Sequence, residues 1–572
     1  MNKRNETEVI QAWQETVQAE VNARPWFAAL LLQKGSLLFT RFVYFYERLT
    51  AVGQRARRRL AVGLGTAVLA LALSQTPAHA DNITVTPGAA GINGGDGCSL
   101  VEAIINANDD ATTHAECAPG NGADIITLAG NSYSYTTTFG PQSALPDITS
   151  PITIAGNGAT IQRTGGSNFR LMRVDLGDLT LNDVTVTGGN ATTSPTTGGG
   201  IRNNADSTLT LNNATISGNT AGLGGGIYNI GTLNINQSVI TTNTATNGGG
   251  IATNTGTMLT INDSTISNNT ASNGSDFGVG GGLRLAGGSM TINRTTISGN
   301  TAFLRGGGFE VSATGALTLN HSTVSGNDAT FGGGVSNYGT MTLNNNTIVG
   351  NSATQPVTGA GGIVQLSGTM TLNRNIVAGN SAPVSREINR FGGTLNANNR
   401  NVLGHNGLTN AQAFSGFTPG ANDRTATSDG SVPTALASIL DTTLADNGGP
   451  TLTHALVSGS PAVDFIPTSD PACQAGVSTD QRGAVRAGQV VPGDGRGGLA
   501  CDAGAFEFDS AETPTAVTLQ AITATSAGKA NGLAAFAASL LTGLGGLWLW
   551  MRSRTAVWQT NVSHFGIDEA VQ

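Results

Sequence analysis

The chain has 572 residues, of which 80 are glycine and only 11% are charged, which is a low charge content for a globular protein. Residues 1–80 hold ten basic and five acidic side chains, whereas the remainder holds 18 basic and 31 acidic ones. Because nucleic-acid binding needs a basic surface, this acidic excess disfavours a nucleic-acid partner. The length allows one large domain with appendages.

The first 80 residues predict an export leader. Four arginines within residues 55–59 precede an apolar run, Leu60 to Leu73, and Ala-His-Ala ends at Ala80. A basic region, a hydrophobic region and a small-residue cleavage site in this order are typical of a signal peptide. An uncleaved membrane anchor is the alternative interpretation.

Residues 81–160 begin the exported part and are expected to form an N-terminal cap with the first coils. Ser99 and Glu102 form a capping-box pattern, which predicts a short helix that helps to close the first coil. In an exported chain, two local cysteine pairs favour disulfides over zinc binding. We therefore predict two bridges, each in an end cap: Cys98–Cys117 and Cys473–Cys501.

Eight copies of one short pattern follow, with a period near 25 residues, and they predict a solenoid. Aliphatic residues alternate with polar ones, and a glycine cluster ends each copy. The pattern therefore indicates parallel strands joined by tight corners, with three strands and three corners in each coil. The first asparagine of the copies recurs at Asn182, Asn212, Asn236, Asn262, Asn293, Asn320, Asn344 and Asn373.

Two side-chain columns of the expected stack can be assigned from the pattern. From Asp124 to Leu403, we predict an interior column that contains Leu211, Ile235, Ile261, Ile292, Leu319, Leu343 and Leu372. The threonines between inward residues are expected to point outward: Thr180, Thr210, Thr260, Thr291, Thr318, Thr342 and Thr371.

A second asparagine follows seven residues after the first in seven copies, and in the first copy it slips by one position to Asn190. Stacked amides can bond along a column, so we interpret these residues as a structural ladder. Ligand binding through them is the alternative. The predicted ladder contains Asn219, Asn243, Asn269, Asn300, Asn327, Asn351 and Asn380.

A second apolar segment lies near the C-terminus. Residues 532–551 carry no charge and are long enough for a transmembrane helix, and Arg552 and Arg554 predict a cytoplasmic tail at 552–572. Residues 510–531 are typical of a linker. A buried core helix, or a sorting tail removed after export, is the alternative interpretation of this segment.

Three stretches resemble known families of exported bacterial proteins. "CSLVEAIINAN", followed by Cys117, resembles the CSLREA domain, with Val101 in place of the usual arginine. "NGGPTLTHALVSGSPAVD", "TDQRGAVR" and "ACDAGAFEF" resemble the choice-of-anchor Q domain. The coils are similar to polymorphic outer-membrane protein repeats, although an aliphatic residue replaces their aromatic one. These resemblances imply a right-handed parallel β-helix at the cell surface, and they imply no reaction.

The expected fold is therefore an all-β, right-handed, single-stranded parallel β-helix with stapled caps, a signal region and a C-terminal transmembrane helix. The repeats occupy residues 161–390, and a choice-of-anchor Q-like region occupies residues 391–509. We expect an exported, surface-anchored structural or binding protein, adhesin-like, that contacts a glycan or a surface ligand. We expect the protein to need no cofactor or metal. Secretion after C-terminal processing is the alternative to anchoring.

Two other functions remain open. A polysaccharide lyase or glycoside hydrolase would need clustered carboxylates or a positioned base. The best hint of such a cluster is Arg284, Arg305 and Glu310, which are expected on one face across adjacent coils, and which we interpret as a solvated ion pair with no catalytic role. Ice binding through the outward threonines is the third possibility, but the positions beside them vary.

Overall fold

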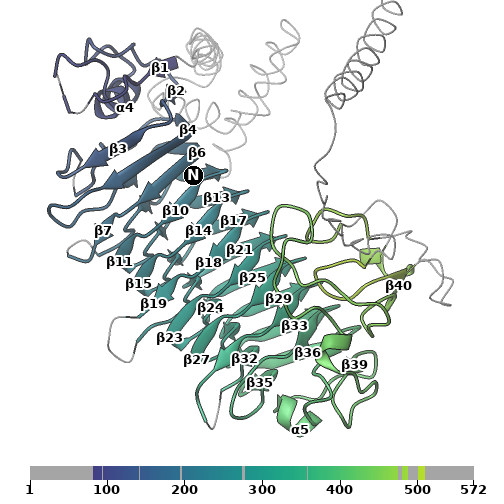
Figure 1. The fold of residues 1–572 in the computed structure, drawn as a ribbon. Helices are drawn as coiled ribbons and strands as arrows, with labels where there is room; N and C mark the ends of the chain where they lie inside the picture. The colour runs from purple at the N-terminus through teal and green to yellow at the C-terminus, as the bar shows by residue number, and fades with distance from the viewer. Residues whose placement is uncertain are drawn as a thin grey trace, which may run out of the picture. The chain divides into compact units, whose positions relative to one another are not determined.

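The computed structural model describes residues 82–508, apart from residues 90, 93, 141, 194–195, 273–276, 357–358, 474–478 and 487–499. These residues form a parallel β-solenoid of about 11 turns, in which equivalent strands of successive coils pair side by side (Figure 1). The strands fall into four rows that run along the stack. The predicted solenoid is confirmed, and its right-handed winding stays a prediction.

Rows 1 and 2 together make one 22-stranded sheet. Row 1 contains β1 (Asn82–Thr84), β2 (Asp124–Thr127), β4 (Ile152–Arg163), β6 (Asp178–Thr187), β9 (Thr208–Asn212), β13 (Thr232–Asn236), β17 (Met258–Asn262), β21 (Gly288–Asn293), β25 (Gly315–Asn320), β29 (Thr340–Asn344), β33 (Thr369–Asn373) and β36 (Thr394–Asn399). The strands β4 and β6 continue into row 2. The other strands of row 2 are β3 (Ser132–Tyr135), β10 (Thr215–Ser217), β14 (Val239–Thr241), β18 (Thr265–Ser267), β22 (Thr296–Ser298), β26 (Thr323–Ser325), β30 (Thr347–Val349), β34 (Ile376–Ala378), β37 (Val402–Leu403) and β39 (Arg424–Thr425).

Rows 3 and 4 are separate parallel sheets. Row 3 contains β7 (Asn190–Ala191), β11 (Thr220–Leu223), β15 (Thr244–Asn247), β19 (Thr270–Ala271), β23 (Thr301–Arg305), β27 (Asp328–Phe331) and β31 (Ser352–Ala353). Row 4 contains β5 (Met172–Val174), β8 (Ile201–Asn203), β12 (Ile227–Asn229), β16 (Ile251–Thr253), β20 (Leu283–Leu285), β24 (Phe309–Val311), β28 (Val335–Asn337), β32 (Ile363–Gln365), β35 (Ile388–Arg390) and β38 (Phe414–Ser415).

Each full coil therefore has four strands rather than the three that we predicted. The extra division arises because the residue after the first asparagine adopts a left-handed backbone, with φ of 51° at Asn213 and 48° at Gln237. Asn and Asp tolerate this conformation better than most residues. The resulting bend separates row 1 from row 2 without breaking the sheet.

The glycine clusters form the corner between rows 3 and 4. Gly224 has φ of +62°, which favours glycine over residues with a side chain. A Cβ atom added at Gly225 would lie 2.4 Å from the carbonyl oxygen of Gly249 in the next coil. Side chains at this corner would therefore push adjacent coils apart, which explains why each copy of the repeat ends in glycines.

The predicted interior column is confirmed. Its seven members pair in register from coil to coil, and each is fully buried. The stack extends beyond the predicted limits of Asp124 and Leu403, because β1 pairs with β2 and β37 pairs with β39. Strands β36 to β39 therefore continue the coils past the predicted boundary at residue 390.

The first coils are covered by α4 (Leu100–Asp109). Ser99 is its N-cap, and both hydrogen bonds of the predicted capping box with Glu102 are present. Leu100 and Ile104 join the hydrophobic core of the coils. The Cys98–Cys117 disulfide forms beside this helix, as predicted.

The opposite end of the core is covered by Leu408, Phe414 and the short helix α5 (Asn410–Ala413). The Cys473–Cys501 disulfide also forms, and it joins the 3-10 helix η2 (Pro471–Cys473) to β41 (Ala500–Cys501), which pairs with β40 (Ile466–Pro467). A further 3-10 helix, η1, spans Leu436–Ser438.

Residues 436–508 do not form the end cap that we predicted for the second disulfide, because they lie against the outer side of row 2 (Figure 1). Thr296 donates to the Leu452 carbonyl at 2.6 Å, and Thr323 donates to Gln481 at 2.6 Å. The outward residues of the later row 2 strands include Val349. Residues 436–508 remove this apolar surface from water, which is favourable.

Among the residues that the structure describes, no helix is long and apolar enough to cross a membrane. The predicted signal peptide at 1–80, the linker at 510–531, the transmembrane segment at 532–551 and the tail at 552–572 lie outside the described residues.

Candidate functional site

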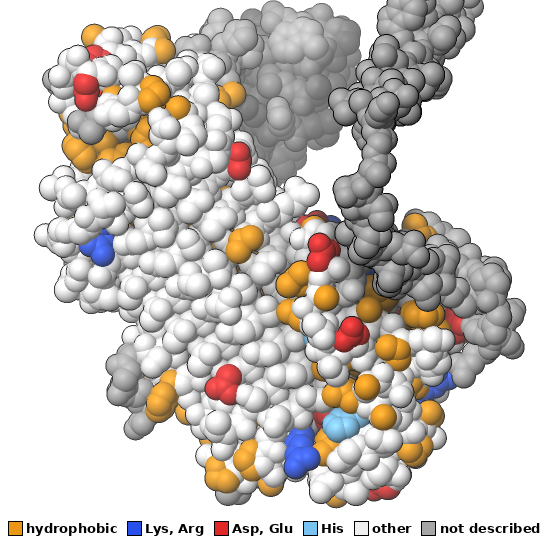
Figure 2. Space-filling view, viewed as in Figure 1, with side chains coloured by type: hydrophobic (Ala, Val, Ile, Leu, Met, Phe, Trp, Pro, Cys, Tyr) orange, Lys and Arg blue, Asp and Glu red, His pale blue; other side chains and the backbone are white. Residues whose placement is uncertain are grey.

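The outer side of row 1 is an open polar surface, which we call the row 1 face. The predicted outward threonines lie on it, half-buried or exposed, between fully buried aliphatic residues. Parallel pairing places these side chains in columns about 4.8 Å apart along the stack. Figure 2 shows that most of the visible surface over these coils is neither hydrophobic nor charged.

The first asparagines form one edge of the row 1 face, and we call them the outer ladder. Each side-chain amide donates to the amide oxygen of the preceding coil, over 2.8 to 3.1 Å, from Asn399 back to Asn182. An asparagine amide has two donor hydrogens and two acceptor lone pairs. The ladder uses one of each, so a half-buried residue keeps the other pair for a ligand or water.

The seven second asparagines form an inner ladder, which is buried between rows 2 and 3. In the first six, Nδ2 donates to the asparagine Oδ1 of the following coil over 2.8 to 3.0 Å, and that same Oδ1 also accepts the backbone N–H. The second hydrogen of Asn243 bonds to the carbonyl of Ile216 in the preceding coil. The amides are therefore fully used inside the stack.

The slipped copy does not contribute to the inner ladder. Asn190 pairs with Thr220 in row 3, one position further along the chain than the ladder. Gly189 takes the ladder position instead, and its backbone N–H donates to Asn219 Oδ1 at 2.9 Å. The ladder thus begins on a backbone group rather than on an amide side chain.

A third polar column was missed in the sequence, because its residue type changes from coil to coil. Each member accepts the backbone N–H of its equivalent in the preceding coil, over 2.8 to 3.5 Å. Its members are Ser238, Ser264, Thr295, Ser322, Asn346, Asn375, Asn401 and Asp423. The first seven share one signal, a short hydrogen-bonding side chain two residues after an asparagine of the outer ladder.

Both buried columns end on a carboxylate. Glu387 closes the inner ladder, accepting from Asn380 Nδ2 at 2.7 Å and from the Gly379 backbone at 2.8 Å. Burial raises the pKa of Glu387 to about 8. Asp423 closes the third column, and burial raises its pKa as well. The carboxyl group accepts hydrogen bonds from the last N–H groups of the column, so no further coil is needed to supply an acceptor.

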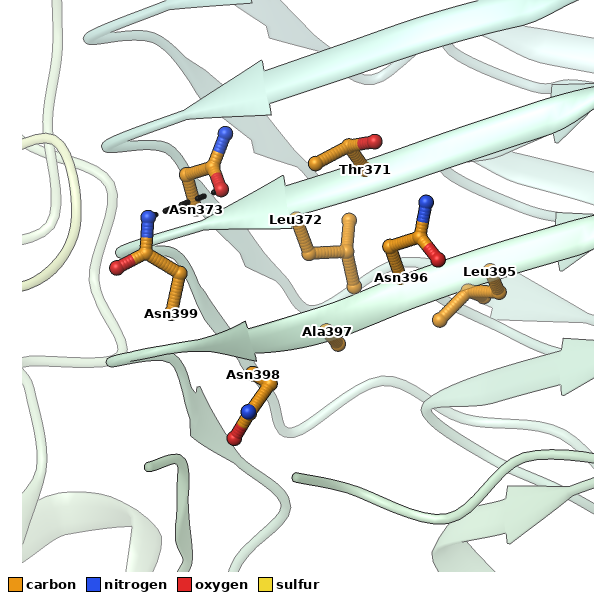
Figure 3. A pocket seen from close by; sticks show the side chains of 8 residues that line it. All are labelled: Thr371, Leu372, Asn373, Leu395, Asn396, Ala397, Asn398 and Asn399. Atoms are coloured by element: carbon orange, nitrogen blue, oxygen red, sulfur yellow. Dashed lines mark hydrogen bonds between the residues drawn. The ribbon is translucent and has the colours of Figure 1, made fainter. Parts of the chain in front are cut away.

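A shallow cavity of about 400 Å³ opens on the row 1 face between β33 and β36 (Figure 3). Two asparagines of the outer ladder, Asn373 and Asn399, lie on its rim and share a 3.1 Å hydrogen bond. The full lining consists of Thr371, Leu372, Asn373, Leu395, Asn396, Ala397, Asn398 and Asn399.

The predicted charged trio comes together, with Arg284 and Glu310 on row 4 and Arg305 at the adjoining end of β23 in row 3. Arg284 and Glu310 are paired in register, and the guanidinium of Arg305 lies 5.1 Å from the ring centre of Tyr338. Burial raises the pKa of Glu310, although Arg284 and Arg305 oppose the shift. Glu310 is only 4% exposed, so our interpretation as a solvated ion pair is wrong.

The trio does not form a closed ion-pair network. Ser312 donates to one oxygen of Glu310 at 3.3 Å, and the other oxygen has no hydrogen-bond partner among the described residues. Within the same part of the chain, no group of three His, Cys, Asp or Glu side chains could hold a metal ion.

In comparisons with known proteins, no family model, no curated protein and no solved structure matches this chain.

Proposed function

We propose that this chain is an exported, cell-surface-anchored binding protein that contacts a neutral glycan through its row 1 face. The observation that carries the proposal is the continuous open surface of threonine hydroxyls and asparagine amides from β6 to β36. Hydroxyl and amide groups donate and accept hydrogen bonds without imposing a charge, which suits a polymer of neutral sugars.

Export and anchoring rest on sequence. The signal-peptide pattern before Asp81, the apolar segment at 532–551 and the resemblance to CSLREA and choice-of-anchor Q proteins support a location outside the membrane. The two disulfides agree with an oxidising compartment. Protease treatment of intact cells is expected to release the solenoid, and a fully protected solenoid would contradict this location.

The binding proposal is tested by incubating the full-length chain, purified in a mild detergent, with insoluble neutral and acidic polysaccharides. We expect retention on at least one neutral polysaccharide, with no new reducing or unsaturated ends. Absence of retention on every polymer would reject the proposal.

A polysaccharide-degrading enzyme is the second candidate, and the buried Glu310 favours it, because general acids have raised pKa values. Hydrolysis of a glycosidic bond typically uses two carboxyl groups, however, and the charged groups that act on Glu310 are Arg284 and Arg305. We therefore expect Glu310→Gln to leave retention unchanged. New chain ends that disappear in this variant would establish the enzyme instead.

Ice binding is less well supported by the structure. The outward column beside the threonines contains Asp178, Met258 and Ala316, and Met258 is 62% exposed. These substitutions interrupt the regular hydroxyl array that a flat lattice would have to match.

A further inference from the structure

A column of outward side chains runs along row 4, which is a separate sheet from row 1. The residues on either side of each member are in the core or buried, so the column itself faces away from the interior. Parallel pairing keeps its members in register from coil to coil. They are Arg173, Arg202, Tyr228, Ala252, Arg284, Glu310 and Ser336.

The arginines at the N-terminal end of this column are satisfied by the protein itself. Arg173 pairs with Asp147 at 3.2 Å. Arg202 donates to Asn204 Oδ1 at 2.7 Å and to Thr197 Oγ1 at 2.9 Å. Neighbouring side chains therefore supply the acceptors that these two guanidiniums need.

The two arginines near Glu310 lack such acceptors. Arg284 belongs to the column, and Arg305 approaches it from the end of β23, with its guanidinium 5.1 Å from the ring centre of Tyr338. The Nε atoms of both arginines are buried without a partner, and no described residue accepts a hydrogen bond from either guanidinium. Each guanidinium has five N–H donors, so this place holds many donors with no protein acceptor.

Two oxygen atoms at the same place are also without a partner among the described residues. They are Glu310 Oε2 and Ser336 Oγ, on side chains that are 4% exposed and fully buried, respectively. Glu310 and Ser336 are paired in register on adjacent strands. Buried polar groups without hydrogen bonds are unfavourable, and native proteins seldom leave several together. The four unpartnered atoms thus indicate that a ligand completes the cluster.

The charges in the cluster select the kind of ligand. Two guanidiniums and one carboxylate leave one net positive charge even when Glu310 is ionised. Burial raises the pKa of Glu310, although Arg284 and Arg305 oppose the shift. Burial also raises the pKa of Tyr338, so its phenol is neutral at pH 7. A group with a single negative charge would balance the cluster, and a planar guanidinium matches the paired oxygens of such a group.

We propose that Arg284 and Arg305 form a binding site for a singly charged oxyanion, the carboxylate or sulfate ester of an acidic ligand. In the free protein, Glu310 balances part of the arginine charge. When the anion binds, Glu310 takes up a proton, so that Oε2 becomes a donor instead of a repelling charge. The inference goes beyond the proposed function and does not rest on it, because rows 1 and 4 belong to different sheets.

The test is isothermal titration of the full-length chain in detergent with galacturonate, galactose 6-sulfate and neutral galactose. These probes share a sugar ring, so the comparison isolates the anionic group and separates a carboxylate from a sulfate ester. Arg284→Gln and Arg305→Gln each remove one guanidinium. Arg202→Gln is the matched control, because Arg202 lies in the same column and over a tyrosine ring, at 5.8 Å from Tyr228, but has protein acceptors.

We expect the wild-type chain to bind at least one anionic probe about tenfold or more tightly than galactose. Arg284→Gln and Arg305→Gln should each weaken that binding about tenfold, as expected for lost charge-assisted hydrogen bonds. Arg202→Gln should stay within about twofold of wild type. Thermal unfolding checks that the variants fold, and if Arg305→Gln does not, Arg284→Gln decides.

The role of Glu310 gives a second readout, which a purely structural cluster would not show. Burial and proton uptake predict that wild-type binding tightens as the pH falls from 7 to 5, where both anionic probes stay ionised because simple carboxyl groups titrate at about pH 4 or below. Glu310→Gln should bind about threefold more tightly than wild type at pH 7 and lose this pH dependence.

Three results would overturn the site. The first is that the wild-type chain binds neither anion more tightly than galactose. The second is that Arg202→Gln weakens binding as much as Arg284→Gln, which would indicate an effect of overall charge. The third is that Glu310→Gln weakens binding. None of these results bears on retention of neutral polysaccharides by the row 1 face, so failure of this inference and failure of the proposed function are distinguishable.

Discussion

The inner and outer ladders use the same residue in opposite ways. In the inner ladder, each amide donates toward the C-terminal end of the stack and has every hydrogen-bonding group occupied. In the outer ladder, each amide donates toward the N-terminal end and keeps a donor and an acceptor on an accessible surface. The role of a repeated asparagine therefore depends on its burial. A fully buried asparagine joins adjacent coils, whereas a half-buried one can contact a partner.

The largest expected difference between the ladders is in stability, and one coil offers a matched pair. Asn300→Ala would remove the acceptor of the Asn269 side-chain amide and of the Asn269 backbone N–H, and the side-chain donor to the Ile266 carbonyl, all in the interior. We expect a loss of about 3 kcal/mol or more in the free energy of unfolding, since each unsatisfied buried group costs about 1 kcal/mol or more.

Asn293→Ala is the control for this comparison, because Asn293 is half-buried and water can replace its two ladder bonds. We expect its loss to be about 1 kcal/mol or less. Denaturant unfolding of both variants measures the difference. Equal losses would show that the outer ladder is as structural as the inner one.

A smaller effect is expected where the inner ladder ends. The pKa of Glu387 rises from its ordinary value of 4.5 to about 8 because the group is buried, so the folded chain holds a proton that the unfolded chain releases above pH 4.5. Its contribution to stability is therefore present at low pH and is lost as the pH rises through about 8.

Glu387→Gln removes this titration and keeps an acceptor for Asn380. We expect the stability of the wild-type chain, relative to this variant, to fall steadily between pH 5 and pH 8. Unfolding measured at several pH values provides the comparison. Parallel profiles for the two chains would mean that Glu387 does not titrate in this range.

Much of the fold could be predicted from the sequence because the repeat signals are local. Leu211 and its equivalents alternate with polar residues, and Ser99 lies three residues before Glu102. Each of these patterns fixes a nearby structure. The disulfides were also predictable, since an exported chain with two local cysteine pairs has few other pairings.

The remaining features depend on contacts between distant parts of the chain. Gln481 bonds to Thr296 and Thr323 across more than 150 residues, and no local pattern indicates that residues 436–508 cover row 2. The β-bulge at Asn398 looks like ordinary sequence variation until the register of β33 and β36 is known. The third column was missed because Ser, Thr, Asn and Asp alternate within it.

The most direct test of the account compares retention of two single variants on the neutral polysaccharide that binds the wild-type chain. Thr291→Lys places a long charged side chain on the row 1 face, whereas Thr301→Lys places it on row 3 of the same coil, and both positions are exposed. The account predicts that Thr291→Lys reduces retention several-fold and that Thr301→Lys leaves it unchanged. Unchanged retention of Thr291→Lys, or an equal loss in both variants, would contradict the assignment of binding to the row 1 face.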